Sequence, residues 1–133
     1  MTDAVTDQPV LYSVADGVAT IALNRPQAMN SLDVATKVAL RDAVTEAAGD
    51  PAVRCVVLTG SGRAFCVGQD LKEHVALLQD ASSEELFTTV PDHYNPIVTA
   101  LATMPKPVVA AVNGVAAGEI GRASCRERVC LYV

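Results

Sequence analysis

The sequence that decides the fold is VVLTGSGRAFCVGQDL, residues 56–71. The apolar run 53–59, which includes its first four residues, predicts a buried strand of the kind found in parallel sheets. Small residues follow as far as Gln69, and they predict a loop that leads into a helix near 70–79. A second stretch, KPVVAAVNGVAAG at residues 106–118, shows the same pattern of an apolar strand followed by a glycine loop. Two such units favour a layered α/β fold.

The segments before residue 56 extend this prediction. Two strand-like runs, 10–14 and 18–23, flank Asp16-Gly17, a dipeptide that suits a tight turn with positive φ, so a hairpin is expected. Apolar residues then recur at helical spacing until Gly49-Asp50-Pro51 ends the pattern. This helical stripe comprises Leu32, Ala35, Ala39, Leu40, Ala43, Val44 and Ala47.

Further helices are expected between the two glycine loops. Ser82 and Glu85 form a plausible capping box, and helical character resumes from about Ile97 to Met104. The third apolar strand, 108–112, follows Lys106-Pro107. The order ββα-β-αα-β is that of an α/β layer fold in which helices connect the strands of a sheet.

Composition excludes several classes of protein. The chain has 133 residues, 50% hydrophobic and 19% charged, which fits one globular domain. Its net charge of -5, without a basic stripe, argues against nucleic acid as a partner. The first eight residues resemble no signal or transit peptide, and no apolar run is long enough to cross a bilayer, so no membrane partner is expected. The four cysteines match no zinc spacing; we expect no metal, and reduced thiols in a cytoplasmic protein.

The two glycine loops are the candidate functional elements. Glycine lets a backbone approach a ligand closely, and two loops at the ends of neighbouring strands could direct two N–H donors at one oxygen, as in an oxyanion hole. Small residues after a strand are also common as simple turn formers, so the pattern alone leaves both interpretations open.

Three segments resemble known motifs, in the same order. Residues 21–33, 56–71 and 106–118 look like successive signatures of the enoyl-CoA hydratase/isomerase (crotonase) superfamily, and the resemblance covers about residues 10–118. It implies a crotonase-like spiral of ββα units, truncated after the strand that leads to the second oxyanion loop. It also implies an acyl-CoA substrate, of which coenzyme A is a part, with no separate cofactor. Intact members of the superfamily are expected to form homotrimers or hexamers.

The resemblance also assigns site residues. Two backbone N–H groups would hold the thioester oxygen: that of Gln69, directly after Gly68, and that of Glu119, directly after Gly118. The substrate-binding positions implied are Arg25, Ala64, Phe65, Gly68, Gln69, Asp70, Leu71, Lys72 and Gly118. Arg25 is either a contact to the CoA phosphates or a solvated surface arginine, and Asp70 fits a helix cap better than a catalytic acid.

The match to the superfamily ends at Gly118. Arg122 occupies the position where a catalytic glutamate often stands, and a guanidinium stays protonated at neutral pH, so it cannot act as a general acid or base. The second catalytic acid would lie beyond this chain, so we expect the chain itself to be inactive. Residues 119–129 look, codon by codon, like the translation of a short-read sequencing adapter. We therefore divide the chain into a disordered N-terminus (1–9), a partial acyl-CoA-binding domain (10–118) and a non-native tail (119–133); a divergent natural terminus is the alternative.

For the intact gene product the resemblance implies enoyl-CoA hydratase (lyase) or isomerase activity in fatty acid metabolism, through an enolate held by an oxyanion hole. Hydratase and isomerase differ chiefly in where their carboxylates stand, so this sequence leaves the choice open. A non-catalytic acyl-CoA-binding or oligomer-forming paralogue is the alternative function.

Overall fold

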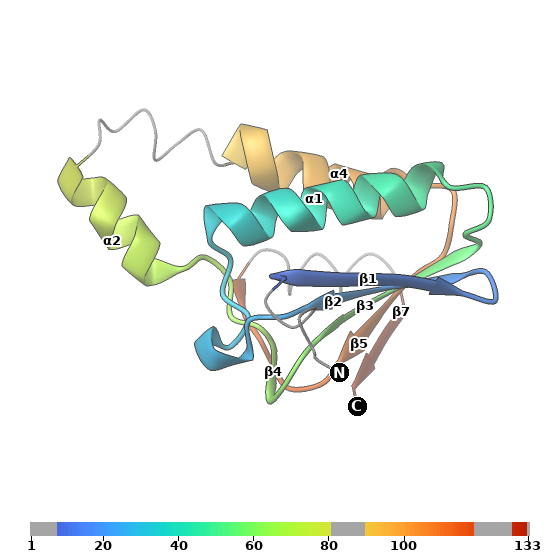
Figure 1. Cartoon of the computed structure of the whole chain (residues 1–133), viewed down its shortest axis with the longest axis horizontal. Coiled ribbons are helices and arrows are strands. Elements are labelled where there is room, and N and C mark those ends of the chain that lie inside the picture. Colours follow the sequence, from blue (N-terminus) through green and yellow to red (C-terminus); the bar gives the residue numbers. More distant parts are fainter. Residues whose placement is uncertain (1–7, 81–89, 119–128, 133) are drawn as a thin grey trace, which may run out of the picture.

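A computed structural model describes residues 8–80, 90–118 and 129–132. Its main feature is a five-stranded sheet in the order β1-β2-β3-β5-β7 (Figure 1). The strands are β1 (Val10–Ala15), β2 (Val18–Leu23), β3 (Cys55–Gly60), β5 (Val108–Val112) and β7 (Val129–Tyr132). Strands β1 and β2 are antiparallel, and every other neighbouring pair is parallel. A second, two-stranded parallel sheet joins β4 (Ala64–Cys66) to β6 (Val115–Ala116).

The β1–β2 hairpin confirms the turn expected from the sequence. Asp16 and Gly17 both have positive φ, +53° and +81°, which matches the twist of the two strands they connect. The Gly17 carbonyl accepts a hydrogen bond from the N–H of Arg54, at 2.7 Å. The turn therefore also places the start of β3 beside β2.

Helices α1 (Val34–Gly49) and α4 (Asn95–Thr103) pack against each other on one face of the sheet, whereas α2 (Leu71–Asp80) extends away from the body (Figure 1). A short 3-10 helix, Pro26–Ala28, precedes α1, and a π-helical turn, Val90–Tyr94, precedes α4. Helix α1 begins after Asp33, whose side chain accepts a hydrogen bond from the N–H of Thr36 at 2.9 Å. At its other end the Lys106 ammonium donates to the carbonyls of Ala47 and Asp50, both at 2.7 Å.

One apolar core lies between the sheet and the two helices. Alternate residues of the central strands are buried there with the apolar stripe of α1. The core residues from the strands include Ala19, Ile21, Leu23, Val56, Leu58, Val108 and Ala110, and those from α1 include Leu40, Val44 and Ala47. The other residues of β3 are half-buried, so the prediction of a strand buried on both faces is wrong. The described helices cover only the face of the sheet on which Val56 and Leu58 are buried (Figure 1).

Several elements differ from the sequence prediction. The segment 60–69 is not a single loop, because Ala64–Cys66 forms β4, which includes Cys66. The sequence did not predict this strand because three residues are too few to show strand periodicity. Helix α4 begins at Asn95, two residues earlier than predicted, because proline is tolerated in the first turn of a helix. In the stripe of α1, Ala35 is exposed and Ala39 half-buried, while Thr36 and Lys37 are buried.

The predicted ends of the chain lie partly outside the described residues. Gln8 and Pro9, assigned to a disordered N-terminus, are held by Asn24, which donates to both of their carbonyls. Residues 129–132, assigned to a foreign tail, form β7 parallel to β5. The exposed edge of β5 offers unpaired backbone groups, and Val-Cys-Leu-Tyr is rich in strand-forming residues. The capping box Ser82/Glu85 and the segment 119–128 lie outside the described residues.

Candidate active site

The two glycine loops identified in the sequence touch each other. Gly68 and Gly118 have φ values of +88° and +79°, a conformation that favours glycine. A Cβ built on Gly118 would lie 2.8 Å from the Cα of Gly68, and one built on Gly68 would lie 3.2 Å from the Cα of Gly118. The N–H of Ala117 donates to the carbonyl of Cys66 at 2.8 Å, which joins the two loops just before the glycines. The contact therefore requires residues without a side chain at both positions.

The backbone of Gln69 is held so that its N–H points away from Leu32. The N–H of Leu32 donates to the carbonyl of Gly68 at 2.7 Å, and the N–H of Asp70 donates to the carbonyl of Leu32 at 3.0 Å. Successive N–H groups of an extended chain point to opposite sides, so the N–H of Gln69 points away from Leu32. It has no backbone or side-chain acceptor among the residues that the structure describes. The first donor predicted from the sequence is thus available, whereas Glu119, the predicted second position, lies outside the described residues.

The side chain of Gln69 bonds two residues that the sequence prediction missed. Its Oε1 accepts hydrogen bonds from the Lys37 ammonium, at 2.8 Å, and from the Tyr94 hydroxyl, at 2.5 Å. Lys37 is only 1% exposed, and its Nζ lies 4.9 Å from the centre of the Tyr94 ring. Burial lowers the pKa of Lys37, and the nearby carboxylates of Glu73, Asp33 and Asp70 partly oppose that effect. Helix α1 thus places the buried Lys37 ammonium in contact with Gln69 of the first glycine loop.

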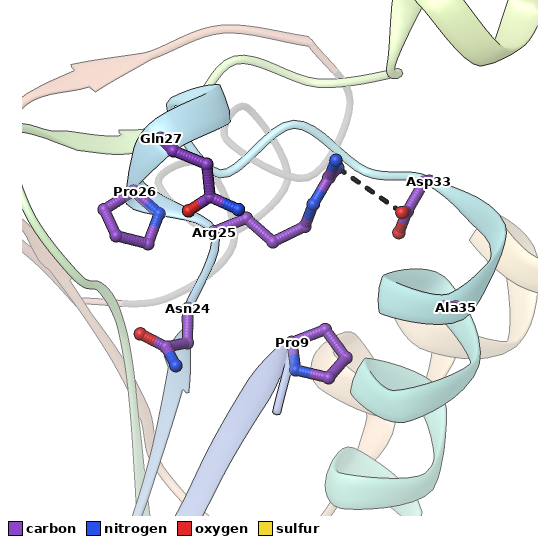
Figure 2. A pocket seen from close by; sticks show the side chains of 7 residues that line it. All are labelled: Pro9, Asn24, Arg25, Pro26, Gln27, Asp33 and Ala35. Atoms are coloured by element: carbon purple, nitrogen blue, oxygen red, sulfur yellow. Dashed lines mark ion pairs between the residues drawn. The ribbon is translucent and has the colours of Figure 1, made fainter. Parts of the chain in front are cut away.

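Arg25 connects three segments around the loops. Its Nη1 donates to the carbonyl of Ser31 at 2.7 Å and to Oδ2 of Asp70 at 3.2 Å, and it lies 3.6 Å from Oδ2 of Asp33 (Figure 2). Its side chain is 20% exposed, so it is not the solvated surface arginine that the sequence left open. Asn30, fully buried in the same loop, fixes the backbone: its Oδ1 accepts from the N–H of Arg25 at 2.7 Å.

Asp70 caps helix α2, as the sequence indicated. Its Oδ1 accepts hydrogen bonds from the N–H groups of Lys72 and Glu73, at 2.9 and 3.2 Å. Partial burial alone would raise the pKa of the Asp70 carboxyl, but the hydrogen bonds from Glu73, Arg25 and Lys72 hold this pKa below its ordinary value. The carboxylate therefore stays ionised and belongs to the framework of the site.

Arg25 lines two pockets. The larger, about 670 Å³, is lined by Pro9, Asn24, Arg25, Pro26, Gln27, Asp33 and Ala35 (Figure 2). The second, about 500 Å³, is lined by Arg25, Gln27, Ala28, Ser31, Val67, Gln69, Asp70, Leu71 and Lys72. This second pocket unites five of the predicted substrate-binding residues, which come from the segment before α1, the segment before α2 and the first turn of α2.

Four predicted substrate contacts line neither pocket: Ala64, Phe65, Gly68 and Gly118. The side chains of Ala64 and Phe65 are 1% and 0% exposed and belong to the interior, so the prediction that they border the substrate is corrected here. Their role is in the framework, since the Ala64 carbonyl accepts hydrogen bonds from the side-chain amides of Asn30 and Asn113. Within the described ranges, no group of three or more His, Cys, Asp or Glu side chains could hold a metal ion, and no helix is long and apolar enough to span a membrane.

The fold and the site together define an α/β protein in which glycine loops expose a backbone amide beside a pocket. The sequence profile described as "Enoyl-CoA hydratase/isomerase" matches residues 13–121. The chain belongs to the enoyl-CoA hydratase/isomerase family, and its fold is a partial crotonase fold.

Individual relatives agree with this assignment. The chain is 42% identical over 109 residues to 1,2-epoxyphenylacetyl-CoA isomerase of Escherichia coli, covering 82% of this chain and 41% of the relative. It is 37% identical over 112 residues to crotonyl-CoA hydratase of Syntrophomonas wolfei, covering 82% and 40%. A crystal structure of an enoyl-CoA hydratase of Mycobacterium smegmatis superposes with a TM-score of 0.71 at 39% identity, covering 81% and 41%. The chain therefore spans about two fifths of the length of these relatives.

Proposed function

We propose that this part of the protein binds an acyl-CoA thioester, with the N–H of Gln69 donating to the thioester carbonyl oxygen. The observation that carries the proposal is the N–H of Gln69, which has no acceptor among the described residues and lies at the contact of the two glycine loops, beside a pocket that Gln69 itself lines. When the carbon next to a thioester loses a proton, or the β-carbon is attacked, negative charge develops on that oxygen. A fixed donor at this position stabilises the charge, and one such donor typically contributes about 10²–10³ in rate.

The two pockets suggest where the rest of the ligand lies. The 500 Å³ pocket beside Gln69 would take the pantetheine arm, and the larger pocket beyond Arg25 would take the nucleotide end. Lys72, exposed at the rim of the first pocket, adds positive charge for the phosphates. Arg25 already bonds Asp70 and Ser31, so we assign it mainly to shaping the wall between the pockets.

For the intact protein we propose hydration or double-bond isomerisation of an enoyl-CoA. The family description names both reactions, and one relative is named as a crotonyl-CoA hydratase, which supports hydration. We also propose a cytoplasmic homotrimer or hexamer; the exposed apolar side chains of Leu71 and Val75 on α2 are available for contacts between subunits. The 133-residue chain, which carries Arg122 at a catalytic position, should bind a thioester without turning it over.

An optical titration tests the binding proposal. The purified chain is titrated with an aryl-conjugated enoyl thioester of CoA, whose absorption moves to longer wavelength when a donor polarises its carbonyl group. The matched control is the CoA thioether of the same acyl skeleton, which has the same nucleotide and pantetheine but no carbonyl oxygen. We expect both to bind, the thioester about tenfold or more tightly and with a red shift, because only it can accept from Gln69. Equal affinities without a red shift would show that the N–H of Gln69 does not contact the carbonyl.

A further inference from the structure

Lys37 is the feature that the proposed function leaves unused. It lies on the buried face of α1, in the same stripe as Leu40 and Val44, and is 1% exposed. Transferring an ammonium group from water into a protein interior is costly unless hydrogen bonds and other electrostatic interactions offset the loss of hydration. A methionine would fill the same stripe at lower cost, so packing alone does not account for a charged residue here.

The cation determines how the Gln69 side chain is oriented. An ammonium group can only donate hydrogen bonds, so the atom of the carboxamide that faces Lys37 must be the oxygen. The Tyr94 hydroxyl donates to the same oxygen, and the ring of Tyr94 lies under the ammonium at 4.9 Å. One carboxamide oxygen is thus held by two donors, one from α1 and one from the turn before α4.

The residue held in this way is the one that carries the predicted oxyanion donor. The backbone on either side of Gln69 bonds Leu32, and its side chain bonds Lys37 and Tyr94, so the residue is fixed from both ends. One glutamine side chain and one hydrogen bond connect the backbone of Gln69 to the Lys37 ammonium. The positive charge therefore lies close to the Gln69 N–H. Little water separates them, since Lys37 and Tyr94 are buried, and charges interact more strongly in such surroundings.

We propose that Lys37 is a positioning residue of the oxyanion site, whose buried ammonium fixes Gln69 and favours negative charge on the thioester oxygen bound at the Gln69 N–H. This inference rests on the proposed function, because it needs a thioester oxygen at that N–H. The proposed role and a purely structural role predict different effects when Lys37 is replaced by an apolar residue. Replacing a structural lysine lowers the free energy of unfolding, whereas replacing a lysine that acts through its charge on the ligand leaves the free energy of unfolding unchanged or higher.

The experiment compares Lys37→Met with Lys106→Met. Lys106 bonds two backbone carbonyls at the C-terminal end of α1, whereas Lys37 bonds Gln69 from the N-terminal part of that helix. Lys106 is therefore the matched structural lysine. Each variant of the full 133-residue chain is titrated with the aryl enoyl thioester and with the thioether, and its urea unfolding is measured. We expect Lys37→Met to unfold at the same or a higher urea concentration, to lose at least half of the red shift, and to lose about tenfold in thioester affinity while thioether affinity stays unchanged. Lys106→Met should unfold more easily and keep the full red shift.

A second pair of variants checks the route through Gln69. Gln69→Met removes the carboxamide but retains the backbone N–H and the Lys37 ammonium, so it should lose part of the red shift, but no more than Lys37→Met. The double variant should then lose no more than Lys37→Met alone, because removal of the ammonium already abolishes its bond to Gln69.

The outcomes separate the two proposals. If the unmodified chain shows neither a red shift nor a preference for the thioester, the proposed function fails. If it shows both, and Lys37→Met shows them undiminished, the proposed function stands and the role of Lys37 is overturned. Loss of folding in Lys37→Met would also overturn it, because the lysine would then be structural.

Discussion

The substitution Gly118→Ala tests the contact between the two glycine loops, on which the candidate site depends. Gly118 has a φ of +79°, and an added Cβ would lie 2.8 Å from the Cα of Gly68. Carbon atoms in contact are ordinarily about 3.5–4.0 Å apart, so the loops would have to separate by about 0.7 Å or more. The neighbour that must move is backbone, which has no alternative rotamer to adopt.

Two costs follow from this geometry. A left-handed conformation costs a non-glycine residue about 1–2 kcal/mol, and overpacking a close contact costs about 1–3 kcal/mol. We therefore expect Gly118→Ala to lower the free energy of unfolding by about 2–5 kcal/mol. The effect on binding comes from displacement of Gly68 and the adjoining N–H of Gln69. A donor about 2.9 Å from its acceptor that moves back by about 0.7 Å reaches about 3.6 Å, where it no longer forms a hydrogen bond.

The assay combines urea unfolding with the thioester and thioether titrations. Gly118→Ala should reduce the preference for the thioester to near that for the thioether, under conditions where the variant remains folded. Gly49→Ala is the matched control: a Cβ there meets nothing within 4 Å, so we expect unchanged binding and a gain of up to about 1 kcal/mol from helix propensity. Gly68→Ala, with a longer contact of 3.2 Å, should fall between the two in stability. If Gly118→Ala were as stable as Gly49→Ala and kept its preference for the thioester, the two loops would not touch as described.

Three further substitutions probe the framework. Asn30→Asp turns an acceptor toward two carbonyl oxygens, which the amide now contacts at 3.0 and 2.8 Å, and should cost about 2–4 kcal/mol in urea unfolding; an unchanged midpoint would contradict the observed bonds. Asp70→Asn should flatten the acid limb of stability. Because the folded pKa of Asp70 is depressed, its stabilisation is complete above the unfolded value near 4 and is lost as pH falls through the folded pKa, so equal acid limbs in the two proteins would be inconsistent with the ion pair to Arg25. Tyr12→Phe removes a buried hydroxyl that has no partner among the described residues, and should raise the melting temperature by an amount corresponding to about 1 kcal/mol; a lower melting temperature would reveal a partner for that hydroxyl.

The sequence predicted most of the sheet because its long strands carry their own signal. Residues 18–23 and 108–112 have the length and apolar content of core strands, and Asp16-Gly17 specifies the hairpin turn. The short strands β4 and β6 carry no comparable signal. With three and two residues they are defined by the pairing of two distant segments, and nothing in either segment alone specifies that pairing.

The two glycine loops could be located in the sequence because glycine marks both of them. The structure gives Gly68 and Gly118 the positive φ and the close backbone approach that favour glycine. The assignment of the Gln69 N–H as an oxyanion donor came from the resemblance and stays a prediction. The side chains of Ala64 and Phe65 were assigned to the substrate by their place in the motif. The structure assigns them to the interior, since the direction of a side chain depends on β4, which the sequence did not predict.

Lys37 shows where a further signal was available. It stands three residues before Leu40 and seven before Val44, so helical periodicity alone places it on the buried face of α1. The apolar stripe predicted from the sequence includes Ala35 and Ala39 instead, because a lysine does not contribute to an apolar pattern. A charged residue at a core position of an otherwise regular helix is the pattern to look for, since burial of its charge requires compensating partners. Its partners are the one thing periodicity does not reveal: Gln69 lies 32 residues away in sequence, and only the folded chain brings the two together.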